Sequence, residues 1–334
     1  MRTMESWIAG IILLVVKLGV VLVLLLLAAA YIVWVERKLL GRLQVRYGPN
    51  RAGRFGLLQP LADLIKLMTK EDTVPEAADR KIFLLAPAVV GTTAILIFAV
   101  IPFGSVWVLW GKSIPMVISD LNVALLFVIA LSSLGVYGVA LGGWASNSKY
   151  SLLGGIRGAA QMISYELSLG LSLVPVVMWA QSFSLVDIVN AQTRYPFILV
   201  QPVSFLIFFV SALAEIKRIP FDLPEAENEL VAGYHTEYSG MRFGLFFLGE
   251  YITLIVLGGL VAAFFLGGWR GPFLPPLVWF VLKVLAIVFV MIWIRGTLPR
   301  LRYDQLMALG WKVLIPVSLL NIMATGALIL MMRV

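Results

Sequence analysis

Carboxylate side chains gather in one stretch of this sequence, among apolar residues. Seven of the 18 acidic residues lie between positions 215 and 250: Glu215, Asp222, Glu225, Glu227, Glu229, Glu237 and Glu250. A carboxyl group removed from water ionises less readily, so it can gain and lose protons near neutral pH. The stretch therefore indicates proton handling. The alternative is a solvated loop with ordinary caps, and the spacing of Asp222 and Glu225 predicts a capping pair at the start of a short helix.

Two carboxylates lie deep within long apolar runs. Glu250 stands about nine residues into one run, and Glu166 is similarly deep in another. A charge at the centre of a membrane costs about 2.5–3.5 kcal/mol on insertion scales, so such residues usually face a wet interior and serve transport. The alternative is an ion pair with Lys or Arg on a neighbouring helix. For Glu215 that partner could be Arg218, three residues along the same helix face.

Several other chemistries are excluded by composition. The chain has no cysteine, so it forms no disulfide and supplies no thiolate to an iron–sulfur cluster. His235 is the only histidine, which excludes a multi-histidine metal or haem site, and we expect no metal. The net charge is +8, but the basic residues flank apolar runs, which argues against nucleic-acid binding.

The elements that position these residues are membrane spans. Of the 334 residues, 61% are hydrophobic and 13% are charged, whereas soluble domains are about half apolar and a quarter charged. The sequence predicts a single all-α membrane domain over residues 1–334, a polytopic bundle of about eight transmembrane helices. Each run is long enough to cross a membrane, which takes about 20 residues. The predicted spans are residues 7–35, 82–103, 120–142, 157–180, 198–219, 241–266, 276–296 and 306–331.

An amphipathic helix is predicted in the loop after the first span. Its apolar residues recur at helical spacing, namely Leu57, Leu61, Leu64, Ile65 and Met68, with Gln59, Asp63, Lys66 and Lys70 opposite. Such a helix lies in the plane of the membrane interface. It could form one wall of an entrance for a lipid-soluble ligand or pack on the bundle, and spacing alone does not separate these two interpretations.

The distribution of Lys and Arg predicts the orientation of the chain. Of the 26 basic residues, 19 fall in the loops after the first, third, fifth and seventh spans, and 5 lie on the other side. The remaining two, Lys17 and Lys283, stand inside spans. The positive-inside rule therefore places the 19 on the cytoplasmic side and both termini outside, in the periplasm if the cell is bacterial.

Four long segments together resemble the H subunit of bacterial NADH:quinone oxidoreductase, respiratory complex I, and its mitochondrial counterpart, NADH dehydrogenase subunit 1. They are ERKLLGRLQVRYGPNRAGRFGLLQPLADLIKLMTKED, LLGGIRGAAQMISYELSLGLSLVPVVM, AEIKRIPFDLPEAENELVAGYHTEYSG and IRGTLPRLRYDQLMALGWKVLIP. The resemblance implies eight helices in the bacterial inner membrane, at the junction of the membrane arm with the hydrophilic arm. It also implies a quinone passage framed by the first helix, the interfacial helix and the sixth helix.

The resemblance implies roles for particular residues. The proton path would comprise Glu166, Glu215, Asp222, Glu225, Glu227, Glu237 and Glu250. The quinone chamber would comprise Glu36, Arg42, Arg46, Arg51, Asp63, Arg218 and Phe221. Quinone would be a substrate, while FMN and iron–sulfur clusters would belong to partner subunits of the hydrophilic arm. Adjacent membrane subunits and lipid would be further partners.

We therefore expect a subunit, not catalytic alone, that helps to build the quinone chamber and couples quinone reduction to proton translocation. One alternative is the equivalent subunit of a membrane-bound hydrogenase or of a ferredoxin- or deazaflavin-dependent complex. A second is a free-standing proton or solute transporter, and a third is an anchor for the hydrophilic arm.

Overall fold

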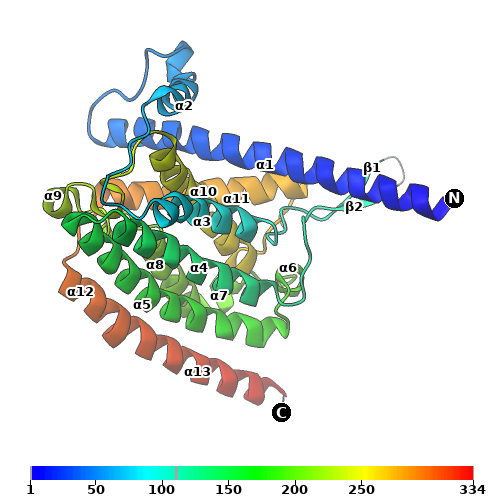
Figure 1. Ribbon diagram of the computed structural model, residues 1–334. Helices are drawn as coiled ribbons and strands as arrows, with labels where there is room; N and C mark the ends of the chain where they lie inside the picture. The colour runs from blue at the N-terminus through cyan, green and yellow to red at the C-terminus, as the bar shows by residue number, and fades with distance from the viewer. Residues whose placement is uncertain (1, 110–111, 334) are drawn as a thin grey trace.

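A computed structural model describes the backbone of residues 2–109 and 112–333, and their side chains except at 2–13, 107–109, 112–114, 227 and 333. It is a layered bundle of long helices with one short β-hairpin (Figure 1). The helices are α1 (Arg2–Leu43), α2 (Gln59–Thr69), α3 (Arg80–Phe98), α4 (Ala124–Ala145), α5 (Lys149–Ala180), α6 (Leu185–Ala191), α7 (Phe197–Val200), α8 (Pro202–Glu215), α9 (Glu227–Leu230), α10 (Gly240–Phe265), α11 (Pro276–Thr297), α12 (Tyr303–Ala308) and α13 (Ile315–Arg333). The hairpin pairs β1 (Val106–Leu109) with β2 (Lys112–Pro115). Short 3-10 turns cover Arg54–Gly56 and Gly233–His235, and a π-helical turn at Leu309–Leu314 joins α12 to α13.

The bundle is organised around α10. Within the described part of the chain, seven helical segments are long and apolar enough to cross a membrane, so the predicted polytopic membrane bundle is confirmed. The apolar window of α10 is 78% buried inside the chain, against 17% for α1 and for the segment from α12 to α13. α10 is therefore the central helix, and the first and last spans present most of their apolar surface outwards.

The predicted span at 198–219 is wrong as one continuous helix. Its helical part consists of α7 and the 14-residue α8, separated at Gln201, whose backbone (φ −130°, ψ 58°) is not helical. Pro202 is the cause, because proline disfavours the helical conformation in the residue before it. At the other end α8 stops at Glu215, and Lys217 has a left-handed φ of 58°. Residues 216–219 are therefore free of the helix and can direct their side chains in several directions.

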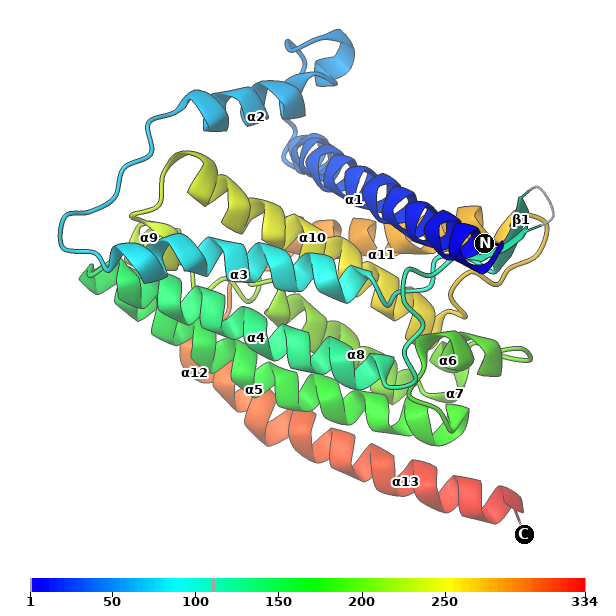
Figure 2. The same ribbon diagram turned by 45° about the vertical axis from the view of Figure 1, so that its right-hand side comes forward.

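The two chain ends lie at one end of the bundle, while α2 and α9 lie at the other (Figure 2). The hairpin lies beside α1, where the Lys17 ammonium donates hydrogen bonds to the carbonyl oxygens of Pro115, at 2.8 Å, and Val117. Lys283 similarly caps the end of α10 by donating to Leu266 O at 2.6 Å. Lys17 and Lys283, the two lysines predicted inside spans, thus both donate hydrogen bonds to backbone carbonyl oxygens.

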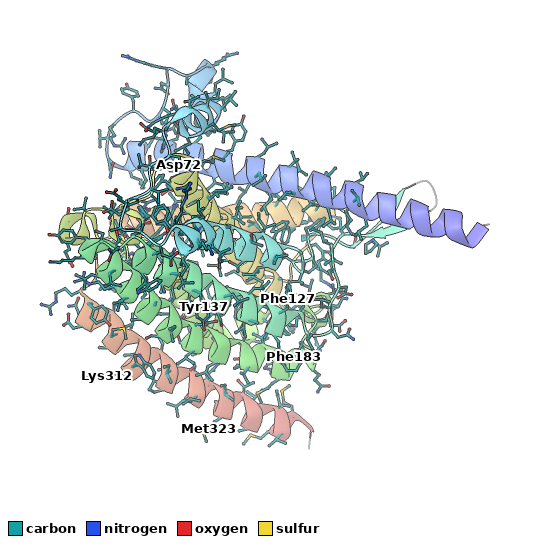
Figure 3. All side chains as sticks on the ribbon, viewed as in Figure 1. Asp72, Phe127, Tyr137, Phe183, Lys312 and Met323 are labelled. Atoms are coloured by element: carbon teal, nitrogen blue, oxygen red, sulfur yellow. The ribbon has the colours of Figure 1, made fainter. Side chains whose placement is uncertain are left out.

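The predicted amphipathic helix is α2, and no residue of it is buried in the chain. It projects from the bundle beyond the C-terminal end of α1, and its apolar residues, among them Leu61 and Met68, are exposed. Asp72, where the following loop returns to the bundle, pairs with Arg242 of α10 at 3.0 Å (Figure 3). The helix therefore packs on the bundle only in part, through Leu67, whose side chain lies against Gly244 of α10, while its other apolar residues remain free for lipid or a partner.

Glycine allows one close approach that fixes the loop between α9 and α10. A Cβ atom on Gly154 of α5 would stand 2.5 Å from the backbone nitrogen of Tyr234, closer than real contacts allow. A Cβ on Gly91 of α3 would meet nothing within 4 Å.

We therefore expect Gly154→Ala to lower the stability of the protein by about 1–3 kcal/mol, the usual cost of overpacking. Gly91→Ala should leave it equal or slightly higher, because alanine favours helix. The measurement is the thermal-unfolding midpoint of the detergent-solubilised protein. Equal midpoints for the two variants would show that this approach is not tight.

Candidate functional site

The turn after α8 directs two successive cations to different partners. The side-chain amide of Gln161, from α5, donates hydrogen bonds to Ala214 O and Phe221 O, both at 2.8 Å, which fixes the chain between them. Lys217 and Arg218 lie within this stretch and are 4% and 9% exposed. The possible pair between Glu215 and Arg218 is absent from the ion pairs of the described residues, because α8 ends at Glu215 and the helical spacing is lost.

Arg218 belongs to a cluster around Glu36. Its Nη1 donates to Glu36 Oε2 at 2.6 Å, and Arg295 of α11 donates to the other carboxylate oxygen. Glu36 of α1 is 2% exposed, and the Arg218 guanidinium lies 4.1 Å from the centre of the Tyr251 ring on α10. Two arginines and one carboxylate leave this cluster with a net positive charge, which suits a ligand that carries carbonyl oxygens or becomes negative. A small hollow beside it is lined by Leu213, Met291 and both arginines.

Lys217 belongs to a second cluster around Glu250. Its ammonium lies 3.6 Å from Glu250 Oε1 and donates to the hydroxyl of Tyr234 at 3.3 Å. That hydroxyl in turn donates to Glu250 Oε1 at 2.8 Å. Glu250, on α10, is 6% exposed and Tyr234 is fully buried. Glu250 is thus paired with a cation, as the alternative to a proton-path role predicted. The pairing does not remove Glu250 from a possible proton path.

Three titratable groups of the loop surround this second cluster. Burial raises the pKa of Glu225 well above its usual range, and the nearby carboxylates of Glu250 and Asp222 raise it further. The Lys217 ammonium acts in the opposite direction and lowers this pKa. Burial lowers the pKa of His235 to about 4, so the ring is neutral at pH 7. Burial and Glu250 hold the pKa of Tyr234 well above its usual value, so its hydroxyl keeps its proton. Of these three groups, Glu225 is thus the one whose pKa is shifted so that it keeps a proton to a higher pH than usual for a glutamate.

A cavity continues from Glu250 between α3, α4, α5 and α10. About 60 Å³ of it is open to the centres of water-sized groups, and its polar lining consists of Thr93, Ser132, Glu215, Lys217, Glu250 and Thr253. Glu215 is 7% exposed and lies within electrostatic range of Glu166 and Lys217. Glu166 of α5 is half-buried and accepts hydrogen bonds from Ser132, at 3.1 Å, and Ser133 of α4. The carboxylates at 225, 250, 215 and 166 therefore follow one another through the apolar bundle.

Other predicted residues lie away from these clusters. Arg42, Arg46 and Arg51 are exposed at the end of α1 and in the loop that follows. Asp63 of α2 pairs at 2.7 Å with Arg37, on the outside of α1. Phe221 is buried, with its ring edge-on to Tyr165 at 5.4 Å. All five therefore stay predictions as parts of a quinone chamber.

Two further acidic residues of the loop were predicted in the proton path, Glu237 and Glu227. Glu237 is half-buried, and no ion pair of the described residues includes it. Glu227 begins α9, but its side chain lies outside the described residues. The capping pair of Asp222 and Glu225 is wrong: α9 begins after Ala226 with no side-chain cap, because the Glu225 side chain turns inwards to hydrogen-bond Glu250.

Four residues of these clusters escape prediction from the sequence: Arg295, Lys217, Tyr234 and Ser132. Arg295 and Lys217 follow apolar runs, so the sequence places them in cytoplasmic loops. A usable signal for Lys217 is its position beside Glu215 and Arg218, three charges in four residues at the end of an apolar helix. Tyr234 and Ser132 carry no such signal, since tyrosine and serine are common in membrane helices and loops.

Comparison with known proteins identifies relatives over nearly the whole chain. A family model described as NADH dehydrogenase matches residues 16–326. The chain is 73% identical to an H subunit of NADH-quinone oxidoreductase from Syntrophobacter fumaroxidans, over 98% of this chain and 99% of the relative. It is 63% identical to the H subunit from Syntrophotalea carbinolica, over 97% and 98% of the two chains, and 67% identical to an H subunit from Geobacter sulfurreducens, over 93% and 94%.

Because the match covers nearly the whole membrane bundle and includes both buried charge clusters, the chain belongs to the NADH dehydrogenase family, together with the H subunits of NADH-quinone oxidoreductase.

Proposed function

We propose that this chain forms part of the quinone chamber of NADH-quinone oxidoreductase and couples quinone reduction to proton translocation through its buried carboxylates. The observation that carries the proposal is the series Glu225, Glu250, Glu215 and Glu166, which crosses a bundle that is otherwise apolar. Isolated carboxylates are costly in such an environment, so their retention in series favours a proton path. The relatives named as subunits of this enzyme support the same interpretation over a free-standing transporter.

The cluster of Glu36, Arg218 and Arg295 is the quinone-facing part of the proposal. Its guanidiniums are donors only, which suits the carbonyl oxygens of a quinone. Two-electron reduction of a quinone creates negative charge that demands protons, and these cations would stabilise that charge. Bound quinone supplies the redox chemistry, with electrons delivered through FMN and iron–sulfur clusters of partner subunits, while this chain positions charge and moves protons.

Glu225 is the first proton store of the proposed path. Its raised pKa keeps it protonated where an ordinary glutamate is ionised, and it lies within hydrogen-bond reach of Glu250. A proton drawn towards the quinone can leave Glu225, and the negative charge left beside the ionised Glu250 favours the protonated form of the carboxyl groups further along the series, Glu215 and Glu166. Glu166 is half-buried, so it is the member of the series that can face an adjacent membrane subunit.

We further propose a bacterial inner-membrane location with both termini in the periplasm, and with α2 and α9 on the cytoplasmic side against the hydrophilic arm. This orientation rests on the 19-to-5 asymmetry of Lys and Arg. The exposed basic residues Arg42, Arg46 and Arg51 would then meet either that arm or the quinone headgroup route.

Cysteine labelling tests the orientation, because the chain has no cysteine of its own. Asn50 and Asn228 are exposed at the end that carries α2 and α9, and Thr193 is exposed at the opposite end. In intact cells, an impermeant maleimide should label Thr193→Cys and leave Asn50→Cys and Asn228→Cys unlabelled until the membrane is opened. Labelling of Asn50→Cys from outside would reverse the proposed orientation.

Glu166→Gln and Glu250→Gln should each lower proton-coupled quinone reduction by about tenfold or more, since the amide keeps the shape but carries no proton. The measurements are enzyme content on native gels, quinone-reductase rate and proton uptake by vesicles. Glu229→Gln is the matched control, because the Glu229 side chain is 51% exposed and pairs with Arg157 on the surface. Normal coupled rates in both buried variants would remove the proton path.

Glu225→Gln should change the pH dependence of proton uptake. The raised pKa of Glu225 means that the wild-type group keeps its proton to a higher pH than an ordinary glutamate and loses it as the pH rises further. The wild-type rate should therefore fall on the alkaline side, and Glu225→Gln should lower the rate and remove that part of the profile. The profile of vesicles from pH 5 to 10 measures this, with Glu229→Gln again as control. An alkaline limb that survives unchanged in Glu225→Gln would assign it to another group.

A further inference from the structure

The cavity that begins at Glu250 stops short of Glu166. Met162 and Leu169 line it from α5, and they lie four residues before and three residues after Glu166 on the same face of that helix. Glu166 itself is absent from the lining. The cavity therefore runs past Glu166 without reaching it, and another side chain lies between the cavity and the Glu166 carboxylate.

That group is Ser132 of α4. It lines the cavity, as do Val128, Gly135 and Val139, which share its helix face. Its hydroxyl also lies 3.1 Å from Glu166 Oε1. Among the lining residues, it is the one whose described hydrogen bonds join the cavity to the Glu166 carboxylate.

We propose that Ser132 is the relay and positioning residue that joins the cavity to Glu166, an inference that rests on the proton path proposed above. Two acceptors lie within reach of its single hydroxyl proton, Glu166 Oε1 and, at 2.9 Å, the carbonyl oxygen of Ile129. The hydroxyl can therefore point to the carboxylate or turn back to its own helix.

The proton step is balanced at every atom. Protonated Glu215, which lines the cavity, gives its proton to a water molecule, and that water passes one of its own protons to the Ser132 oxygen as the original hydroxyl proton passes to Glu166 Oε1. The water and the serine end neutral, Glu215 is left as a carboxylate, and the Glu166 carboxylate becomes a carboxylic acid. Rotation of the hydroxyl towards Ile129 O then resets the relay. The cavity has room for such water, since about 60 Å³ of it is open to the centres of water-sized groups and one water molecule needs about 10–15 Å³ on that measure.

Ser133 supplies a matched control. It also donates to Glu166 Oε1 and also reaches the Ile129 carbonyl, at 3.1 Å, but it does not line the cavity. Removing either hydroxyl takes one hydrogen bond from Glu166 and leaves the other. A role limited to holding Glu166 in place would therefore make the two alanine variants alike, whereas a relay role makes them differ.

The test uses the intact enzyme in membrane vesicles, with Ser132→Ala, Ser133→Ala and Ser132→Thr compared for native-gel content, quinone-reductase rate and proton uptake in H₂O and D₂O. We expect Ser132→Ala to lower proton uptake by about tenfold, less than the roughly 100- to 10,000-fold typical of a proton-transfer group, because water can replace the hydroxyl in part. Ser133→Ala should stay within about twofold of wild type. Ser132→Thr keeps a hydroxyl and should retain most of the rate and the wild-type solvent isotope effect.

Equal losses in Ser132→Ala and Ser133→Ala would overturn the relay, and so would normal uptake in Ser132→Ala or a loss in Ser132→Thr as large as in Ser132→Ala. Measuring Glu166→Gln in parallel distinguishes a failure of the Ser132 relay from a failure of the proposed proton path. A defect in Glu166→Gln with none in Ser132→Ala removes the relay alone, whereas normal uptake in Glu166→Gln removes the proton path itself.

Discussion

Ionised side chains buried in an apolar bundle must be compensated by partners, and this requirement governs the packing around α10. Glu36, Lys217, Arg218 and Glu250 are all less than a tenth exposed. Their partners come from different elements, namely α1, the turn after α8, α10 and α11. Removing one partner from a buried pair typically costs about 3–5 kcal/mol, because the other charge is left uncompensated. The relative positions of these helices are therefore fixed by charge as well as by apolar contact.

The same constraint brings the two clusters together. Lys217 and Arg218 are adjacent in sequence, yet one faces Glu250 and the other faces Glu36, because the left-handed backbone at Lys217 ends the helix. A shift of Arg218 towards a newly charged quinone would therefore move the Lys217 ammonium relative to Glu250. In the proposed function, a single turn of chain carries the effect of quinone reduction to the first carboxylates of the proton path.

The spans were predictable because hydropathy is a local property, and the predictions at 120–142, 241–266, 276–296 and 306–331 agree with the helices to within four residues. The helices α1 and α5 extend about eight residues beyond the predicted spans, into more polar sequence that hydropathy does not mark as helical. The prediction at 198–219 was wrong because the apolar character of the sequence continues through Pro202 and past Glu215, whereas the helix α8 begins at the first and ends at the second. The site was predictable only in part. Arg218 meets Glu36 across 182 residues and Arg295 meets it across 259, and pairings at such distances cannot be read from spacing along one helix. Asp222 and Glu225 show the converse, since a spacing typical of a cap is overridden by the burial of Glu225 beside Glu250.

A fixed cation in the middle of the proposed path has a consequence for leakage. Two hydroxyls of the cavity lining, Thr93 and Thr253, donate to carbonyls of their own helices, at 3.0 and 2.9 Å, so they offer acceptor oxygens to the cavity. Acceptors favour a mobile proton, but the Lys217 ammonium repels it. Two unit charges about 4 Å apart interact by about 4 kcal/mol at an effective dielectric constant near 20. In the proposed function, the Lys217 ammonium, partly offset by Glu250, would oppose the entry of a free proton, and a negative charge arriving from the quinone side would lower that barrier.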